Sequence, residues 1–275
     1  FFLGDVRDLE RLKMAMNGVD YVVHAAALKQ VPAAEYNPME FVKTNINGAE
    51  NIIHAAIHQK VKKIIALSTD KAANPINLYG ATKLASDKIF IAANNITGSQ
   101  KTIFSVVRYG NVAGSRGSVI PYFQELIDNK KKYLPITHED MTRFWITLEQ
   151  AIDFVFMSFR NMIGGEIFVP KIPSVKIVDL AKAMAPNLKT KIVGIRPGEK
   201  IHELMCPNEY HHLTIEFKKY FKIIPSPDSL DSKKNFLIDN LREKGKKVSS
   251  DFEYSSGLND NFLSINQINK INKTL

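Results

Sequence analysis

Hydrophobic and polar positions change most sharply between residues 62 and 88. Two lysines lead into an apolar run, Ile64 to Leu67, which is short and β-branched at its start. This pattern predicts a strand covered on both faces, as in the middle of a parallel sheet. Four polar residues follow at once, from Ser68 to Lys71, and a helical pattern begins after that turn. Ligands of an open parallel sheet bind where its strands end, so we expect the chemistry at this turn.

Similar apolar segments alternate along the chain and predict an α/β protein. Residues 1–8 are expected to form a strand that ends in a turn, and Gly18 to close the helix after it. Leu180 and Met184 lie four residues apart, which predicts a core-facing helix. Beyond about Asp228 the chain is polar, and we expect a loosely packed tail or arm. The other expected strands are residues 20–25, 102–108, 141–147 and 166–170, and the expected helices are residues 9–17, 38–59, 118–129, 148–160 and 178–185.

Composition narrows the class of protein. The chain has 275 residues with an apolar fraction of 45%, and no apolar run approaches the ~18 residues that a membrane-spanning helix needs. We therefore expect no membrane partner. The single cysteine, Cys206, excludes an internal disulfide and fits a reducing cytoplasm.

The formal net charge of +9 comes largely from scattered lysines. The scattered lysine clusters offer no interleaved aromatic platform for bases, so no nucleic-acid partner is expected. Attraction of anionic nucleotide-sugars and cofactors explains the charge, and compositional bias is the simpler alternative. The seven histidines lack ligand spacing with cysteines or carboxylates, so we assign no metal.

Tyr79 and Lys83 are four residues apart on the predicted helix, so their side chains share one face. An ammonium group beside a phenol favours the phenolate and lowers the pKa of the phenol from about 10. Such a tyrosine can take a proton from an alcohol while a hydride leaves for a nicotinamide. The same spacing also occurs in surface pairs without function, but the preceding strand and the polar Ser68 and Thr69 favour the catalytic interpretation.

The segment from Ser68 to Lys83, Ser-Thr-Asp-Lys-Ala-Ala-Asn-Pro-Ile-Asn-Leu-Tyr-Gly-Ala-Thr-Lys, resembles the extended short-chain dehydrogenase/reductases. Within that family it is similar to the inverting UDP-N-acetylglucosamine 4,6-dehydratases of pseudaminic acid biosynthesis. The resemblance continues through residues 108–118, 141–145, 196–200 and 251–256, and so covers almost the whole chain. It implies a Rossmann-like doubly wound parallel sheet, a tightly bound and recycled NADP (or NAD), a UDP-sugar substrate and a homo-oligomer. Whether the product serves flagellin glycosylation or another surface glycan stays open.

A 4,6-dehydratase oxidises the hexose at C4, expels water across C5 and C6, and returns the hydride to C6. The middle step needs a base at C5 and an acid at the C6 hydroxyl. The resemblance implies Asp70 as the acid and Lys71 as the base, and Thr69, Tyr79 and Lys83 complete the catalytic set. A lysine at its ordinary pKa of about 10.4 is a poor base, so we expect Lys71 to titrate near about 7 to 8. The alternative is an exposed ion pair in a turn.

The resemblance also assigns residues to the dinucleotide. Small residues after the strand at 20–25 would let the backbone approach the cofactor closely, and tight helix packing is the alternative. Asn45 would support the active-site backbone, or it is a solvated helix residue. The implied cofactor-binding residues are Asp5, Val6, Ala25, Ala26, Lys29, Asn45, Tyr79 and Lys83.

Two arginines are implied in binding the nucleotide-sugar. Guanidinium groups suit diphosphate oxygens, which favours this role for Arg143 and Arg196, and surface ion pairing is the alternative. The first turn of the helix at 118–129 could also hold a phosphate through free backbone amides. The implied substrate-binding residues are Lys29, Thr69, Asn111, Arg143, Arg196 and Glu199.

The chain begins with Phe1, and no G-x-G-x-x-G follows a strand where a dinucleotide fold requires it. We expect an amino-terminal truncation that removes the first βαβ unit and leaves the fragment itself inactive. The incomplete dinucleotide-binding domain is expected at residues 1–165. Residues 166–275 are expected to form a smaller C-terminal substrate-binding lobe and arm, with contributions from residues 111–147. The loop that discriminates NAD from NADP is absent, so that choice stays open.

Two alternative functions fit part of the pattern. A nucleotide-sugar 4-epimerase of the same fold needs Thr69, Tyr79 and Lys83 but has no use for Asp70 and Lys71. A non-catalytic dinucleotide-binding protein would have no need of Tyr79 or Lys83.

Overall fold

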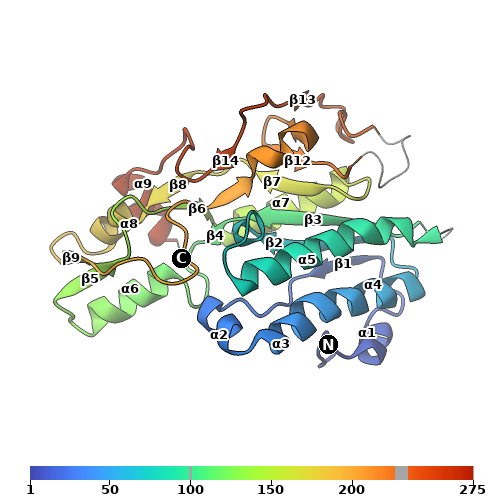
Figure 1. Ribbon diagram of the computed structural model, residues 1–275, viewed down its shortest axis with the longest axis horizontal. Coiled ribbons are helices and arrows are strands. Elements are labelled where there is room, and N and C mark those ends of the chain that lie inside the picture. The colour runs from blue at the N-terminus through green and yellow to red at the C-terminus, as the bar shows by residue number, and fades with distance from the viewer. Residues whose placement is uncertain (99–100, 227–234, 275) are drawn as a thin grey trace.

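The computed structural model describes residues 1–98, 101–226 and 235–274. They form a large lobe around a seven-stranded sheet and a smaller lobe beside it (Figure 1). The strand order of the large sheet is β1-β2-β3-β7-β12-β11-β13. Its strands are β1 (Tyr21–His24), β2 (Lys63–Thr69), β3 (Ile103–Tyr109), β7 (Ile167–Pro170), β12 (Tyr220–Ile223), β11 (Thr214–Glu216) and β13 (Lys246–Lys247).

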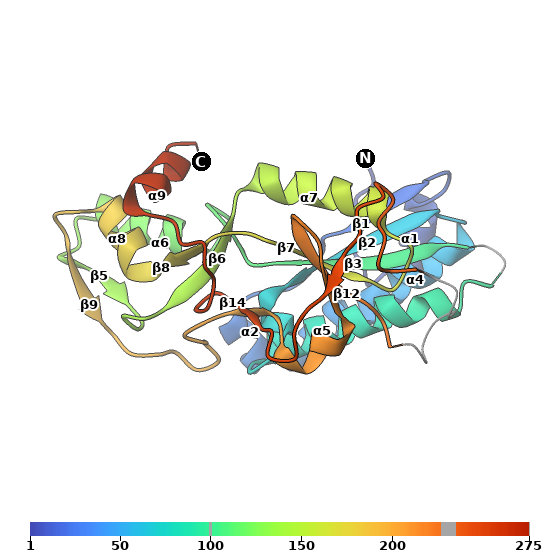
Figure 2. The same cartoon turned by 90° about the horizontal axis from the view of Figure 1, so that it is seen from above.

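Strands β1, β2, β3 and β7 run parallel, and β12, β11 and β13 continue the sheet in antiparallel pairs. In the parallel part, Ile64 lies opposite both Val22 and Phe104. Helices α4 (Gly48–His58) and α5 (Leu78–Ala92) cover one face of the sheet, and α7 (Leu148–Asn161) covers the other (Figure 2). The predicted α/β fold, with a parallel sheet wound on both faces, is confirmed.

The sequence of β2 explains its central place. Ile64 and Ile65 are both fully buried, although their side chains point to opposite faces. Ile64 packs in a cluster with Ile52 and Ile53 of α4, and Ile65 packs in a second cluster with Phe154 of α7. A continuous apolar run is therefore required at this position, because helices cover both faces.

Three short sheets accompany the large one. Sheets β4-β6-β8 and β5-β9 form the smaller lobe, whereas β10-β14 packs against the large sheet through Met205, Cys206 and Tyr254. Trp145 of β6 is buried against Leu180 of α8 and Ile268 of α9. No helix among the described residues is both long and apolar enough to cross a membrane. The elements of this lobe are β4 (Asn111–Val112), α6 (Val119–Asp128), β5 (Tyr133–Ile136), β6 (Thr142–Ile146), β8 (Ser174–Lys176), α8 (Ile177–Met184), β9 (Lys189–Ile192) and α9 (Ile265–Asn272). The sheet packed on the large lobe consists of β10 (Leu204–Cys206) and β14 (Tyr254–Ser255).

Residues 166–275 contribute to both lobes. Strands β7, β11, β12 and β13 belong to the large sheet, and β10 and β14 pack against it, whereas β8, β9, α8 and α9 belong to the smaller lobe. Elements β4, α6, β5 and β6 of residues 111–147 also lie in the smaller lobe. The chain therefore passes between the lobes several times, instead of dividing once at residue 165.

Two expected segments differ from the structure. Residues 1–5 form no strand, since no neighbouring strand pairs with them among the described residues, and 6–7 form a turn. The loose tail was predicted to begin at about Asp228. Residues 227–234 lie outside the described part of the chain. The residues after them are packed: Tyr254, Ser256 and Ile268 are buried. Polar composition there hid the few apolar residues that pack: Tyr254 joins the core cluster of the large sheet, and Ile268 packs on the smaller lobe.

The long helix predicted at residues 38–59 is present, with an interruption. α3 (Pro38–Phe41) leads into a π-helical segment, η1 (Val42–Asn47), before α4. Such π segments are often found at functional sites, and this one contains Asn45. The remaining elements are α1 (Leu9–Ala15), α2 (Val31–Tyr36), η2 (Asp70–Ala72), η3 (Ala93–Asn95) and η5 (Asn208–Leu213).

Candidate active site

The polar turn after β2 brings three predicted catalytic residues together. Thr69 ends the strand, and its hydroxyl caps η2 by accepting a 3.3 Å hydrogen bond from the backbone N–H of Lys71. The same hydroxyl donates to Asp70 Oδ1 over 3.0 Å. This turn lies at the carboxyl ends of the parallel strands, where the sequence places the chemistry.

Helix α5 supplies Tyr79 and Lys83 to the same region. Asn77 caps its start, because the Asn77 side chain accepts a 2.8 Å hydrogen bond from the N–H of Gly80. Tyr79 is 8% exposed and Lys83 3% exposed. Lys83 Nζ donates to the carbonyl of Leu67 over 2.8 Å. This bond ties the amine to β2 directly before residues 69–71, the predicted catalytic turn.

The pKa of Tyr79 does not follow the expectation. Burial raises it, while the charge of Lys71 and a side-chain hydrogen bond with Thr69 act in the opposite direction, and the net pKa is raised. Burial lowers the pKa of Lys83, against the charge of Asp87. The predicted lowering of the tyrosine pKa by Lys83 is therefore wrong for this structure, because burial dominates.

Asp70 and Lys71 form part of a larger charge cluster. Lys71 Nζ lies 3.2 Å from Asp70 Oδ1 and 3.0 Å from Glu203 Oε1. Arg143 Nε lies 3.6 Å from the same oxygen of Glu203. The carboxylates of Asp70 and Glu203 are 1% and 2% exposed, which argues against a solvated surface pair.

Glu203 was not predicted from the sequence. It comes from a segment more than a hundred residues beyond the catalytic turn, and no local spacing relates it to Lys71. The one available signal is its place three residues after Lys200, which ends the resembling segment 196–200.

The three central groups of the cluster have shifted pKa values. Burial raises the pKa of Asp70, although the charge of Lys71 opposes this shift. Burial also acts to raise the pKa of Glu203, but the charges of Lys71 and Arg143 outweigh it and lower the net value. For Lys71 burial acts downward, but Asp70 and Glu203 outweigh it, so the pKa of this amine is raised. The expectation that Lys71 titrates near about 7 to 8 is wrong for this state, since two carboxylates stabilise its proton.

Several buried polar atoms here have no hydrogen-bond partner among the described residues. They include Asp70 Oδ2 and Glu203 Oε2 in the charge cluster. A Cβ added at Gly110 would lie 3.2 Å from Asp70 Oδ2 and 2.5 Å from the Cβ of Phe144. Glycine at this position therefore lets the chain approach the Asp70 carboxylate closely. Buried groups left unpaired in this way are candidates to bind an incoming polar ligand.

Asn111 lies beside this cluster at the start of the smaller lobe. It forms β4 opposite Trp145 of β6, and its Oδ1 is buried without a partner among the described residues. Trp145 Nε1 and Ser118 Oγ share that condition, and Ser118 makes no side-chain cap for α6. These three side chains of the smaller lobe thus offer unpaired donors and acceptors, and Asn111 directly follows Gly110.

The loop of Arg196 and Glu199 packs over the catalytic turn. Lys200 Nζ donates to the carbonyl of Ala73 over 2.7 Å, and the Asn77 side chain donates to the carbonyl of Gly198 over 2.8 Å. Glu199 accepts from the backbone N–H of Arg196 over 3.3 Å. Arg196 itself is exposed, so the loop is anchored while its guanidinium faces solvent.

The predicted cofactor residues lie in three places. Asn45 is buried, and its side-chain amide accepts from the N–H of Leu28 and donates to the carbonyl of Leu28, each over 2.9 Å. The same amide donates to Thr82 of α5 over 3.0 Å. Its amide thus supports the backbone between β1 and α2. Ala25, Ala26 and Lys29 are exposed on that segment, after the carboxyl end of β1.

Asp5 and Val6 lie farther along the sheet face, near α3 and α4. Arg7 binds Asp5 over 2.8 Å and Glu40 over 2.9 Å. The side-chain and backbone hydrogen bonds from Arg7 to Asp5 lower the pKa of that carboxyl to about 2. The carbonyl of Val6 accepts from the Asn51 side chain of α4 over 3.0 Å. Neither residue contacts the charge cluster around Lys71 in any hydrogen bond or ion pair of the described chain.

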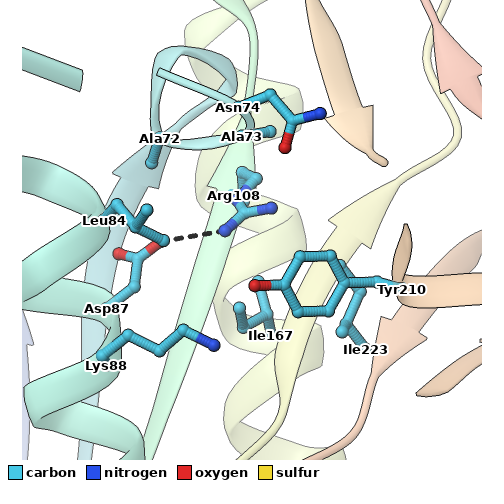
Figure 3. A pocket seen from close by; sticks show the side chains of 10 residues that line it. All are labelled: Ala72, Ala73, Asn74, Leu84, Asp87, Lys88, Arg108, Ile167, Tyr210 and Ile223. Carbon is cyan, nitrogen blue, oxygen red and sulfur yellow. Dashed lines mark hydrogen bonds and ion pairs between the residues drawn. The ribbon is translucent and has the colours of Figure 1, made fainter. Parts of the chain in front are cut away.

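A buried ion pair joins β3 to α5, next to β2 (Figure 3). Arg108 of β3 binds Asp87 of α5 over 3.1 Å and donates to the carbonyl of Met205 over 3.0 Å. Ser68 also donates to Asp87, over 2.8 Å. The cavity beside this pair is about 30 Å³, which suits a water or two but not a nucleotide-sugar. We assign the pair an anchoring role, because it joins α5 and β3 to the chain next to Glu203.

A larger cavity of about 350 Å³ lies between α5 and the end of β12. Its lining includes Lys88, Tyr210 and Ile224, and none of the predicted site residues borders it. The candidate active site is therefore located by the charge cluster at the carboxyl ends of the parallel strands, and not by the size of a cavity.

Known proteins are similar to this chain in sequence. The family model described as "Polysaccharide biosynthesis protein" matches residues 1–225. A Campylobacter jejuni protein named UDP-N-acetylglucosamine 4,6-dehydratase (inverting) is 59% identical over 264 residues, which cover 96% of this chain and 79% of that protein. A Rickettsia rickettsii protein named UDP-glucose 4-epimerase is 41% identical, with coverage of 100% and 80%.

Solved structures agree with the fold. Pen from Bacillus thuringiensis is 35% identical with a TM-score of 0.84, and the match covers 99% of this chain and 81% of that one. DesIV from Streptomyces venezuelae, a dTDP-glucose 4,6-dehydratase solved with NAD and TYD bound, has a TM-score of 0.64 at 21% identity, with coverage of 72% and 68%. The second match supports the fold alone.

Proposed function

The chain belongs to the polysaccharide biosynthesis protein family, and we propose that it is a UDP-N-acetylglucosamine 4,6-dehydratase that inverts C5. One structural observation carries the proposal. An acid and an amine, the buried Asp70 and the half-buried Lys71, lie at the end of β2 in the same turn as Thr69, which hydrogen-bonds Tyr79. A hydro-lyase needs this pair in addition to the tyrosine and lysine that serve oxidation at C4.

Each side chain has a distinct role in the proposed reaction. Tyr79 takes the proton of the C4 hydroxyl, and Lys83, fixed by the carbonyl of Leu67, supports it. Asp70 gives a proton to the departing C6 hydroxyl, a role favoured by its raised pKa, whose main cause is burial. Lys71 takes the proton from C5, which the C4 ketone has made acidic. We place Thr69 at the C4 hydroxyl beside Tyr79.

The residues at the carboxyl ends of β1 and β2 fit a nicotinamide. Ala25 and Ala26 are small and exposed there, and Asn45 fixes the backbone that follows. When bound, the nicotinamide supplies the oxidation at C4 and the later return of hydride to C6. We infer NADP or NAD, tightly bound and recycled, and the NAD in DesIV supports a nicotinamide on this fold. Asp5, Val6 and Lys29 are proposed for the rest of the cofactor.

The nucleotide-sugar is proposed to lie between the catalytic turn and the smaller lobe. Asn111 offers an unpaired buried oxygen, and Arg143 brings a cation to the charge cluster. The exposed guanidinium of Arg196 and the anchored loop with Glu199 are proposed to cover the diphosphate. Lys29 and Thr69 complete this set. From the resemblance we propose a cytoplasmic homo-oligomer acting in pseudaminic acid biosynthesis, for flagellin glycosylation or another surface glycan.

The product formed in deuterated water tests this function. Supplied with the βαβ unit that we expect it to lack, and incubated with UDP-N-acetylglucosamine and NADP or NAD, the protein should yield a 6-deoxy-4-keto sugar that carries deuterium at C5. Proton NMR couplings would report the configuration at C5. A C4 epimer with an intact 6-hydroxyl would instead support the 4-epimerase alternative, which the Rickettsia relative represents. No change in the sugar would contradict both enzymes and favour a non-catalytic dinucleotide-binding protein.

A further inference from the structure

The Glu203 carboxylate lies at the centre of the charge cluster but has no part in the proposed reaction so far. Its Oε1 is 3.0 Å from Lys71 Nζ and 3.6 Å from Arg143 Nε. Its Oε2 is buried and has no hydrogen-bond partner in the described chain. A buried carboxylate that contacts a catalytic amine directly is placed to control that amine.

The backbone of Glu203 is held firmly by the segment near the carboxyl end of the chain. Its N–H donates to Ser256 Oγ over 2.9 Å, and its carbonyl accepts from the N–H of Ser256 over 2.8 Å. Ser256 Oγ also lies 2.7 Å from Thr142 Oγ1, next to Arg143. The carboxylate is therefore carried on a rigid support, and its contact with Lys71 is a fixed part of the fold.

Charged and titratable groups face Lys71 from several elements. The two carboxylates are in direct contact with its amine, whereas the cations act on it from a greater distance. The balance favours the ammonium form, since the attraction of the carboxylates outweighs both burial and the cations. The groups are Asp70 in the same turn, Glu203 before β10, Arg143 on β6, Tyr79 on α5 and Lys200 in the loop that covers the turn.

We propose that Glu203 is a positioning residue of the reaction, whose carboxylate holds the Lys71 amine beside Asp70 in its charged form and so sets the pH at which that amine becomes available as a base. This inference rests on the proposed function, in which Lys71 takes the C5 proton. An opposite charge at such a distance shifts a pKa by about 1 to 3 units. Removing the charge of Glu203 should therefore lower the pKa of Lys71 by that amount.

Chemical modification of the Lys71 amine tests whether Glu203 holds it in the charged form, and this test does not depend on catalysis. Only an unprotonated amine undergoes reductive methylation, and the Lys71 side chain is 25% exposed. At the same pH, below the pKa of the amine, Lys71 should be methylated about 10 to 10³ times faster in Glu203→Gln than in the wild type, because a pKa lower by about 1 to 3 units raises the unprotonated fraction by that factor. Glu203→Asp keeps the charge but withdraws it, so its shift should be smaller. Peptide mass spectrometry between about pH 7 and 11 measures the rate, with exposed lysines of the same digest as reference.

Glu216→Gln is the matched control. It removes the carboxylate of a surface pair, in which Glu216 lies 2.6 Å from Lys171 and both side chains are partly exposed. Methylation of Lys71 should not change in this variant. An unchanged Lys71 profile in Glu203→Gln would overturn the proposal, and if that variant fails to fold, an unchanged profile in Glu203→Asp would do so.

The dehydration rate supplies the second measurement. In Glu203→Gln the acid limb of its pH profile should move to lower pH together with the Lys71 methylation profile. A methylation shift without movement of the acid limb would overturn the role of Glu203 in the reaction. If the wild type forms no 4-keto sugar, the proposed function fails, and the methylation profiles still decide whether Glu203 holds the amine.

Discussion

The Asp70 carboxyl group is suited to act as an acid because it is buried. Burial raises its pKa against the opposing charge of Lys71, so it keeps its proton to a higher pH than an exposed aspartate does. We expect Asp70→Asn to retain C4 oxidation but to slow water elimination by about 10² to 10⁴-fold, since an amide has no acidic proton to give. Absorbance of the reduced nicotinamide and NMR of the 6-deoxy product measure the two steps.

Asp260→Asn is a suitable control for that substitution. Asp260 is exposed, and it takes no part in the ion pairs that Lys71 forms with Asp70 and Glu203. Both steps should therefore proceed at wild-type rates. Elimination at the wild-type rate in Asp70→Asn would remove Asp70 from the mechanism.

Which residues meet at the catalytic turn could be predicted from sequence, but their protonation could not. Thr69 to Lys83 span one strand end, one turn and the start of one helix, so local spacing is enough to bring them together. The pKa of Lys71 depends on Glu203, which only the folded chain brings within 3.0 Å. The pKa of Tyr79 depends mainly on burial, which spacing on a helix does not report.

At the scale of elements, Gly80 sets how closely α5 approaches the catalytic turn. A Cβ added there would overlap the carbonyl oxygen of Lys71 and would lie 3.0 Å from the Cβ of Pro75. Alanine normally stabilises a helix by about 1 kcal/mol relative to glycine. We expect the opposite for Gly80→Ala, a loss of about 1–3 kcal/mol in the free energy of unfolding, because overpacking displaces α5 from the turn. Urea denaturation measures this change.

Ala81→Gly, at the next and exposed position of α5, separates packing from helix propensity. Propensity alone predicts that Gly80→Ala stabilises and Ala81→Gly destabilises by about the same 1 kcal/mol. Packing predicts that both variants destabilise. A higher urea midpoint for Gly80→Ala would show that α5 does not press against the turn.

Element boundaries were predictable where apolar periodicity is continuous. β3 and α7 begin and end within a residue of their expected positions, because both carry buried apolar residues along their length. The strand expected at residues 1–8 is absent, since a strand requires a hydrogen-bonding neighbour and not only an apolar sequence. The packing of Tyr254 and Ile268 was missed because their partners come from distant parts of the chain.

At the scale of the whole molecule, the candidate site depends on segments that repeatedly cross between the two lobes. The catalytic turn and α5 belong to the large lobe, Arg143 lies on β6, and Glu203 precedes β10. A single boundary at residue 165 could not have described this arrangement, because residues 166–275 supply strands to both lobes. Composition along the chain carries no signal for such crossings.

The link between Ser256 and Glu203 makes the stability of the molecule depend on its carboxyl-end segment. Ser256→Ala would leave the buried N–H of Glu203 without its side-chain acceptor and Thr142 without one of its hydroxyl partners. Leaving a buried donor unsatisfied costs about 1–3 kcal/mol, so the urea midpoint should fall accordingly. The dehydration rate should fall as well, because the support of the Glu203 carboxylate loosens.

Ser250→Ala provides the comparison for Ser256→Ala, since Ser250 lies in the same segment but is exposed. Surface substitutions of this kind change stability by less than about 0.5 kcal/mol. If Ser256→Ala were no less stable than Ser250→Ala, the hydrogen bonds around Glu203 would not contribute to the fold. If only its dehydration rate fell, the carboxyl-end segment would serve to position Glu203 and not to stabilise the two lobes.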